Sequence, residues 1–499
     1  MQFSTQPILR ILNRGAICAD SRWFLAILLF GLCLWGWIDV RSRGFYHPDQ
    51  PDEHRTDMTV YTEAGAAFFD GREPYEVTNC RGWGYLYPPL FALLMAPLHS
   101  LASQDQVMVW YVISVLFLWG VYRELTRLVG CVCAEDGPAR QWWAAWYPWL
   151  GIAAFCVAFM PTLNCLQRGQ VGILKLYLLL LGFRLILRGR RWPAWIGGGI
   201  VLSLPIVLKL MPLLPVAFLI FVELVNCWRL RREQPAAGRV ATRCLLSTTA
   251  GLLLGLLLFL LFVPAALVGW QANLRHLTTW SQSTFHKVVD GDVEERSGNS
   301  HGQRNQSLQN AAYRLGNLTA HVFGGGPDDR LAERMPPPPL AMDSPIAETM
   351  LIAARLAILA ALALIGIRLG RLGNRLSLAT AFALGNIAML VISPVARAHY
   401  FMLVAPATIF LPWWLACRGR RRAAVVMAVT PILLIDLHYF AMPITGRIGL
   451  LGLGLTAWLL AAFVLVQRGG PASEKAVKRT TAECAAAVPA AAASAALRA

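Results

Sequence analysis

The chain has 499 residues and a formal net charge of +17, yet only 15% of its residues are charged while 56% are hydrophobic. Soluble domains carry roughly a quarter charged residues. This composition, with a mean hydropathy of +0.50, therefore excludes a disordered protein and argues against an ordinary soluble enzyme. The basic residues stand in short clusters between long apolar runs, which is typical of a polytopic membrane protein rather than a nucleic-acid-binding domain.

Residues 1–22 form a basic N-terminus ahead of the first apolar run, residues 23–38. Arg10 and Arg14 precede this run, and Asp39 follows it without a small-residue cleavage site. A cleaved signal peptide carries such a site. We therefore expect an uncleaved signal anchor with its N-terminus in the cytoplasm.

Twelve apolar runs are long enough, some only with their flanks, to cross a bilayer core that takes about 20 residues. They predict an all-α polytopic protein with about 12 transmembrane helices, its membrane domain over residues 23–466. The Ala-rich tail, residues 467–499, is expected to be disordered and cytoplasmic. The runs are residues 23–38, 107–122, 142–160, 170–187, 194–208, 211–225, 244–268, 350–367, 376–393, 399–416, 423–441 and 448–466.

A thirteenth apolar run, residues 85–101, is interrupted by three prolines. If it does not cross the membrane, the arginine clusters between the later spans all lie on the cytoplasmic side, as the positive-inside rule requires. If it does cross, the cluster at residues 188–191 is sent outside. We therefore expect a segment that does not cross. This topology requires residues 194–225 to form a helical hairpin that reverses near Lys209 and Pro212.

The same topology creates two large outer loops, residues 39–106 and 269–349. In the first loop, Val60, Ala64 and Phe68 recur at helical spacing and predict an amphipathic helix. Asp57 stands near the start of this helix. There it serves either as a helix-capping carboxylate, because Asp is favoured at that position, or as a functional group.

Polar residues that are unusual for a membrane protein converge on the outer side in this topology. Ionisable groups are costly in or near a bilayer, so their placement is informative about function. Both an enzyme site at the outer surface and the outer vestibule of a transporter gather such residues. They are Asp57, Glu63, Arg168, Gln170, Lys209, Asn305, Arg314, Arg397 and His399.

An ordered set of short motifs runs through residues 55–405. The motifs are Asp57-x-x-x-Tyr61, Gly71-x-x-Pro74-Tyr75, Tyr87-Pro88-Pro89-Leu90-Phe91, Gly169-Gln170-Val171, Lys209-x-x-Pro212, Asn305-Gln306-Ser307-Leu308 with Arg314, Ser393-Pro394 and His399-Tyr400. With this set of motifs the chain resembles glycosyltransferase family 87. The resemblance implies a GT-C-like fold and a polyprenyl-phosphate-mannose-dependent mannosyltransferase, which transfers a hexose with inversion at the outer face of the plasma membrane.

The resemblance implies a catalytic carboxylate in the first outer loop, and Asp57 is the matching position. Direct displacement at an anomeric carbon needs a base for the acceptor hydroxyl, and a carboxylate can serve. The leaving phosphate ester carries charge, which cations bind and stabilise. The candidates for donor-phosphate binding are Lys209, His399, Arg397 and Arg168, and those for further substrate contacts are Glu63, Tyr87, Gln170 and Asn305.

Such a reaction requires no cofactor, and a donor without a nucleotide diphosphate requires no metal. The cysteines form no CxxC pair, and we expect them to be free thiols rather than zinc ligands. The expected partners are a polyprenyl-phosphate sugar donor, a lipid or glycan acceptor and membrane lipids, with no nucleic acid.

Each candidate also has a structural interpretation. Lys209 and Arg397 can extend to the membrane surface as long cationic side chains do. His399 can start a helix facing water, Arg168 can set the topology, and Tyr87 can belong to an interfacial aromatic belt.

A transporter or lipid-linked-sugar flippase is the alternative function, and an inactive scaffold is a third. Transporters usually place ionisable groups near the membrane midplane and show a repeated pair of broken helices. The sequence shows no matching repeat, and few ionisable residues fall within the predicted spans, several of them near span ends. These are Lys175, Arg184, Glu223, Arg355 and Asp436.

Overall fold

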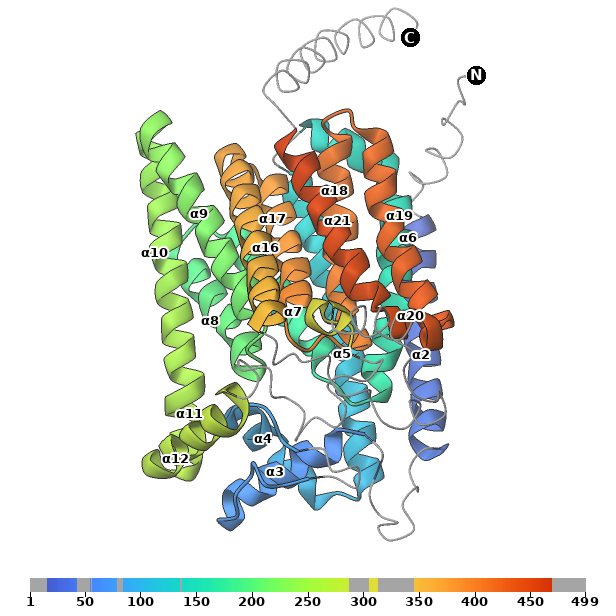
Figure 1. The fold of residues 1–499 in the computed structure, drawn as a ribbon, viewed down its shortest axis with the longest axis vertical. Helices are drawn as coiled ribbons and strands as arrows, with labels where there is room; N and C mark the ends of the chain where they lie inside the picture. The colour runs from blue at the N-terminus through green and yellow to red at the C-terminus, as the bar shows by residue number, and fades with distance from the viewer. Residues whose placement is uncertain are drawn as a thin grey trace, which may run out of the picture.

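The computed structural model describes residues 16–42, 54, 56–78, 84–134, 137–286, 305–312 and 345–468. Most of these residues are helical, and the long helices form one bundle (Figure 1). Among them, nine helices are long and apolar enough to cross a membrane. The expected all-α polytopic membrane fold is therefore confirmed. The predictions for residues 1–15, for Arg314 and for the tail beyond residue 468 lie outside the described residues.

Each predicted span overlaps at least one helix, although residues 170–171 and 211–212 precede their helices and the run 244–268 is divided among three helical elements. Many helices extend beyond the apolar run that predicted them. The apolar runs stop at charged flanks, whereas backbone hydrogen bonding continues through them. The helices of the bundle are α2 (Ala16–Ser42), α5 (Ser103–Cys133), α6 (Gly137–Gln167), α7 (Gly172–Arg188), α8 (Trp192–Leu208), α9 (Leu213–Glu233), α10 (Pro235–Leu257), α16 (Pro345–Leu372), α17 (Arg375–Ile392), α18 (Ala405–Ala416), α19 (Arg421–Phe440) and α21 (Leu450–Gln467).

Shorter helices gather at one end of the bundle, where α3, α4, α11 and α12 lie in Figure 1. The run 85–101 forms two short helices packed on α3, each well below the length of about 20 residues that a span needs. The short elements are α3 (Met58–Asp70), α4 (Pro89–Met95), η1 (Ala96–Ser100), η2 (Leu258–Phe262), α11 (Val263–Val268), α12 (Trp270–Trp280), η3 (Ser281–His286), η4 (Ala398–Val404) and α20 (Met442–Ile448).

Helices α8 and α9 are joined by the four residues 209–212, where the sequence predicts the reversal of the hairpin. Helix α8 packs closely against α10 through small residues. A Cβ added at Gly251 would come within 2.2 Å of the Ile196 carbonyl oxygen, and one at Gly199 within 2.2 Å of the Thr248 carbonyl oxygen. Such close backbone approach is how membrane helices pack tightly. It fixes the position of the turn that carries Lys209.

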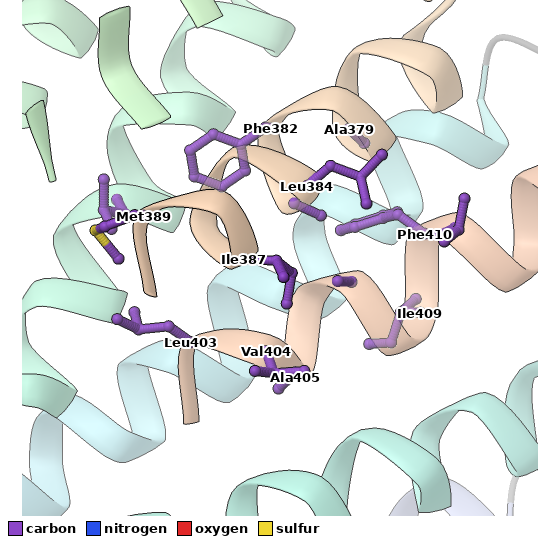
Figure 2. Close-up of a cluster of buried hydrophobic side chains, with 14 of the residues drawn as sticks. Ala379, Phe382, Leu384, Ile387, Met389, Leu403, Val404, Ala405, Ile409 and Phe410 are labelled. Atoms are coloured by element: carbon purple, nitrogen blue, oxygen red, sulfur yellow. The ribbon is translucent and has the colours of Figure 1, made fainter. Parts of the chain in front are cut away.

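The most buried part of the bundle is formed by α17, η4 and α18 (Figure 2). In the apolar stretch of α17, 89% of the residues are buried, and in that of η4 with α18, 94%, whereas those of α10 and α16 are each 22% buried. The outer helices therefore present apolar side chains to lipid. Phe382 of α17 stacks on Phe183 of α7, with ring centroids 4.4 Å apart. The segment that carries His399 is thus anchored in the rigid centre of the bundle.

Candidate active site

Asp57 occupies the N-cap position of α3, but its side chain makes no capping hydrogen bond. Its carboxylate instead accepts a hydrogen bond from the Gln170 side-chain amide. Its backbone N–H donates to the Arg168 carbonyl oxygen at 3.1 Å. Asp57 is therefore held against the turn between α6 and α7. Helix capping does not explain the position of its carboxylate.

The turn between α6 and α7 depends on Gly169, whose φ of +65° lies in the left-handed region. The Trp110 indole N–H of α5 donates to the Gly169 carbonyl oxygen at 3.0 Å. The Gln170 backbone N–H donates to the Cys165 carbonyl oxygen at 3.0 Å. A left-handed residue is favourable for glycine and strained for others. This turn brings the Gln170 side chain to Asp57.

Lys209 lies in the turn between α8 and α9. Its ammonium group donates a hydrogen bond to the Tyr400 hydroxyl and lies 4.3 Å from the Tyr400 ring centroid and 5.3 Å from that of Tyr87. Burial, reinforced by the nearby positive charge of Arg397, lowers the pKa of Lys209 to about 7, while Asp57 acts in the opposite sense. Lys209 therefore points into the protein rather than toward the membrane surface, within electrostatic range of Asp57.

His399 is buried, with 1% of its surface exposed, which does not fit a helix start that faces water. Its ring packs edge-on against Tyr400, with the centroids 4.4 Å apart. Within the part of the chain that the structure describes, its Nε2 has no hydrogen-bond partner. Its position next to Tyr400 places His399 beside the Lys209 ammonium.

Lys175 of α7 is a site residue that the sequence analysis did not single out. It is 1% exposed, and its ammonium lies 4.9 Å from the Tyr400 ring centroid. Its Nζ has no hydrogen-bond partner among the described residues. The available signal was a lysine within a predicted span, since such residues usually face the bundle interior. The sequence did not show which other side chains share that interior with it.

The His399 imidazole lies near several positively charged side chains. Four cations are within electrostatic range of it: Arg168, Lys175, Lys209 and Arg397. Asp57 is within electrostatic range of Lys209 and Tyr400. The site thus places one carboxylate against several cations, an arrangement suited to an anionic ligand.

Aromatic side chains form one wall of the site. The Tyr61 and Tyr87 hydroxyl oxygens are 3.2 Å apart, and the Tyr75 hydroxyl donates to the Tyr87 carbonyl oxygen at 3.2 Å. Burial raises the pKa of Tyr61 and of Tyr87 well above the ordinary value, so both hydroxyls stay protonated. Tyr87 is 7% exposed and contacts the site rather than the membrane interface.

Asn305 holds the segment that leads to Arg397. Its side-chain amide donates to the Pro394 carbonyl oxygen at 3.1 Å, and its Oδ1 accepts from the Ala396 N–H at 3.0 Å and the Ser307 N–H at 3.1 Å. Its backbone also pairs with that of Arg397 in an antiparallel bridge. This geometry fits a positioning residue better than a substrate contact.

Glu63 lies away from Asp57 and the cations around it, and binds other side chains. Its carboxylate binds Arg72 at 2.9 Å and His99 at 3.5 Å, and its side chain is 36% exposed. The structure therefore brings most of the candidates together but leaves Glu63 on another face of α3. Those that it gathers are Asp57, Tyr87, Arg168, Gln170, Lys209, Arg397 and His399, with Asn305 behind them.

No group of three or more His, Cys, Asp or Glu side chains within the described ranges is arranged to hold a metal ion. The cysteines in those ranges are free thiols. The polar groups that converge here are instead a carboxylate, amines, guanidinium groups and an imidazole, which together suit proton transfer and phosphate binding.

The fold defines a polytopic membrane protein with a charged site at one end of its bundle, and comparison with known families gives its class. The model for glycosyltransferase family 87 matches residues 85–394. This match covers more than half of the chain, which therefore belongs to glycosyltransferase family 87 and is a membrane glycosyltransferase. No curated protein and no solved structure matches the chain.

Family membership favours an enzyme over a transporter or flippase. The matched stretch contains part of the site, and the rest lies on either side of it. Asp57 precedes the match, Arg397 and His399 follow it, and Tyr87, Arg168, Lys175, Gln170, Lys209 and Asn305 lie within it.

Proposed function

We propose that this glycosyltransferase transfers a hexose, with mannose expected, from a polyprenyl-phosphate sugar to a lipid or glycan acceptor at the outer face of the plasma membrane. The observation that carries this proposal is the Asp57 carboxylate, bound by Gln170, within electrostatic range of the half-buried Lys209 and of the buried Tyr400 to which Lys209 donates. One base and a set of cations are what a single displacement of a phosphate leaving group needs.

The cations bind the phosphate of the donor. Lys209 and Arg397 supply positive charge, and His399 supplies a buried imidazole nitrogen. These groups also stabilise the charge that develops on the phosphate oxygen as its bond to the sugar breaks. Arg168 and Lys175 add positive charge to the same region.

Asp57 acts as the base. It takes the proton of the acceptor hydroxyl while that oxygen attacks the anomeric carbon, and the bond to the phosphate oxygen breaks on the opposite face. The products are the glycosylated acceptor, with inverted configuration, and the polyprenyl phosphate. The amide of Gln170 donates a hydrogen bond to the carboxylate and orients it.

The outer-face location is supported by the charge at the two ends of α7. This helix begins beside the Gln170 turn and ends at Arg188, in the arginine cluster of residues 188–191. Because such clusters favour the cytoplasmic side, the opposite end that carries Asp57 lies on the outer side.

A donor assay tests the proposal. Purified enzyme in detergent or liposomes receives either a polyprenyl-phosphate mannose or a nucleotide-diphosphate mannose, together with an extract of membrane lipids as acceptor. We expect label to move to the lipid fraction only from the polyprenyl donor. Transfer from the nucleotide donor alone would refute the proposed donor class, and a polyprenyl-phosphate glucose donor tests the choice of sugar.

A further inference from the structure

A charged cavity lies at the other end of the bundle from Asp57. Its volume is about 940 Å³, within the range of roughly 300–1,000 Å³ typical of ligand sites. It is formed by the ends of α5, α7, α8 and α17. Helix α7 has 17 residues and is therefore about 25 Å long, which separates the two sites. Six arginines line the cavity: Arg127, Arg184, Arg188, Arg190, Arg191 and Arg375.

The charge of this arginine cavity is only partly neutralised. The buried Glu124 carboxylate binds Arg127 at 2.7 Å and also binds Arg184. Arg375 donates to the Cys131 carbonyl oxygen at 3.0 Å. Two further acids, Glu135 and Asp136, follow the lining residue Ala134 in the sequence and lie outside the described residues. Even when both are counted, six arginines against three carboxylates leave a net charge of +3.

The position of the arginine cavity points to a lipid. Trp192, which directly follows Arg191, is 62% exposed, and exposed tryptophans mark the level of lipid headgroups at a membrane interface. Leu185 and Ala194 give the cavity an apolar part between the arginines. Arginine matches phosphate oxygens with paired hydrogen bonds, and basic pockets between membrane helices bind anionic headgroups.

We propose that the arginine cavity binds the phosphate headgroup of an anionic phospholipid, in the leaflet opposite the active site. The bound headgroup joins the ends of α5, α7, α8 and α17 and stabilises the bundle there. A topology signal alone needs positive charge but no cavity. Arg371, Arg421 and Arg422 are exposed arginines at the same end that do not line the cavity, and they provide the comparison.

The test compares two triple variants of the full-length protein. In the first, Arg188, Arg190 and Arg191 are each changed to Gln, and in the control Arg371, Arg421 and Arg422 are each changed to Gln. Phosphatidylglycerol and phosphatidylcholine are titrated into detergent-purified protein, with binding followed by native mass spectrometry and stability by thermal unfolding. We expect phosphatidylglycerol alone to bind wild type with saturation and to raise its melting temperature.

The cavity variant should bind phosphatidylglycerol on the order of 100-fold more weakly, because each basic residue near an anionic lipid contributes roughly a fivefold factor. The control should change the affinity less than about threefold. Equal losses in both variants, or equal binding of phosphatidylcholine, would overturn the proposal. The substituted residues are exposed, so folding should persist, and the melting temperature without lipid checks this.

Glycerol 3-phosphate tests whether the cavity binds a soluble anion instead of a lipid, because it carries a phosphate group and a glycerol but no acyl chains. The proposal expects no saturable binding of this compound at concentrations where phosphatidylglycerol saturates. Binding of equal strength would show that the cavity serves a soluble phosphate and would overturn the lipid assignment. Arg190→Gln alone should already weaken phosphatidylglycerol binding several-fold.

Discussion

At the scale of single residues, the site is defined by one carboxylate among cations. Asp57 is bound by the amide of Gln170, and Lys209 faces two tyrosine rings. Removing an ammonium from water is costly, as at the buried Lys175 and the half-buried Lys209, unless a ligand supplies the missing negative charge. The donor phosphate supplies it in the proposed reaction.

The pKa of Lys209 predicts a pH dependence. Because burial and Arg397 lower this pKa to about 7, the ammonium is present below pH 7 and is lost as the pH rises through that value. The KM for the donor should therefore increase above pH 7, by up to about tenfold per pH unit. Lys209→Arg, whose guanidinium stays protonated, should remove this increase. Parallel KM profiles for wild type and Lys209→Arg would contradict the assignment.

Lys175 predicts opposite effects on stability and binding. Its ammonium is buried with no hydrogen-bond partner in the described part of the chain, so Lys175→Met should leave the melting temperature unchanged or raise it. The same change should raise the KM for the donor about tenfold or more, because a charged contact to phosphate is lost. A lower melting temperature with an unchanged KM would indicate a structural role instead.

At the scale of elements, the site depends on three turns: residues 168–171, 209–212 and 393–397. The first contains Gly169 in the left-handed conformation, the second carries Lys209, and the third is held by Asn305. Turns can hold side chains in place only when rigid helices fix their ends. The tightly packed pair α8–α10 and the buried α17–α18 do so here.

Gly169→Ala tests the first turn. A residue with a Cβ is strained at φ +65° by about 1–2 kcal/mol, and this strain should displace Gln170 from Asp57. Gly419→Ala is the matched control, because Gly419 has φ +74° and open space around its Cα. We expect both variants to lose similar stability and only Gly169→Ala to lose about tenfold or more in kcat. Equal kcat in the two variants would contradict the positioning role.

The helices were largely predictable and their contacts were not. Apolar runs predict all twelve bundle helices, but they stop short of charged flanks, so the run 107–122 became α5, which extends to Cys133. Proline positions predict the interruption at residues 85–101. The contact between Asp57 and Gln170 depends on one left-handed glycine and a hydrogen bond from Trp110, which no local pattern encodes.

Among the site candidates, Glu63 also shows that local sequence patterns do not predict side-chain contacts. It lies six residues after Asp57 on the same helix, and helical geometry turns it to another face, where Arg72 and His99 bind it. Lys175 shows the reverse case, since the sequence placed it within a predicted span without a role, and the fold brings its ammonium to 4.9 Å from the Tyr400 ring centroid. Side-chain partners from distant segments decide both outcomes.

At the scale of the molecule, the two ends of the bundle differ in charge. The Asp57 end carries one buried and several half-buried cations near one carboxylate, whereas the other end carries the arginine cavity and the exposed clusters. Arginine clusters account for much of the net charge of +17, and such clusters are typical of the cytoplasmic ends of membrane helices rather than of a site for a polyanionic partner. In the proposed reaction, the cations at the Asp57 end bind the sugar donor.

The central claim is that Asp57 is the base, and Asp57→Asn tests it most directly. Asp70→Asn is the matched control, because Asp70 is an exposed aspartate at the end of the same helix, where its carboxylate binds the exposed Arg72 at 3.1 Å. Sugar transfer from polyprenyl-phosphate mannose and binding of that donor are measured on both purified variants. The account predicts that Asp57→Asn lowers the transfer rate about 10³-fold, with donor affinity within a few-fold of wild type and Asp70→Asn fully active. Transfer by Asp57→Asn at the wild-type rate would contradict it.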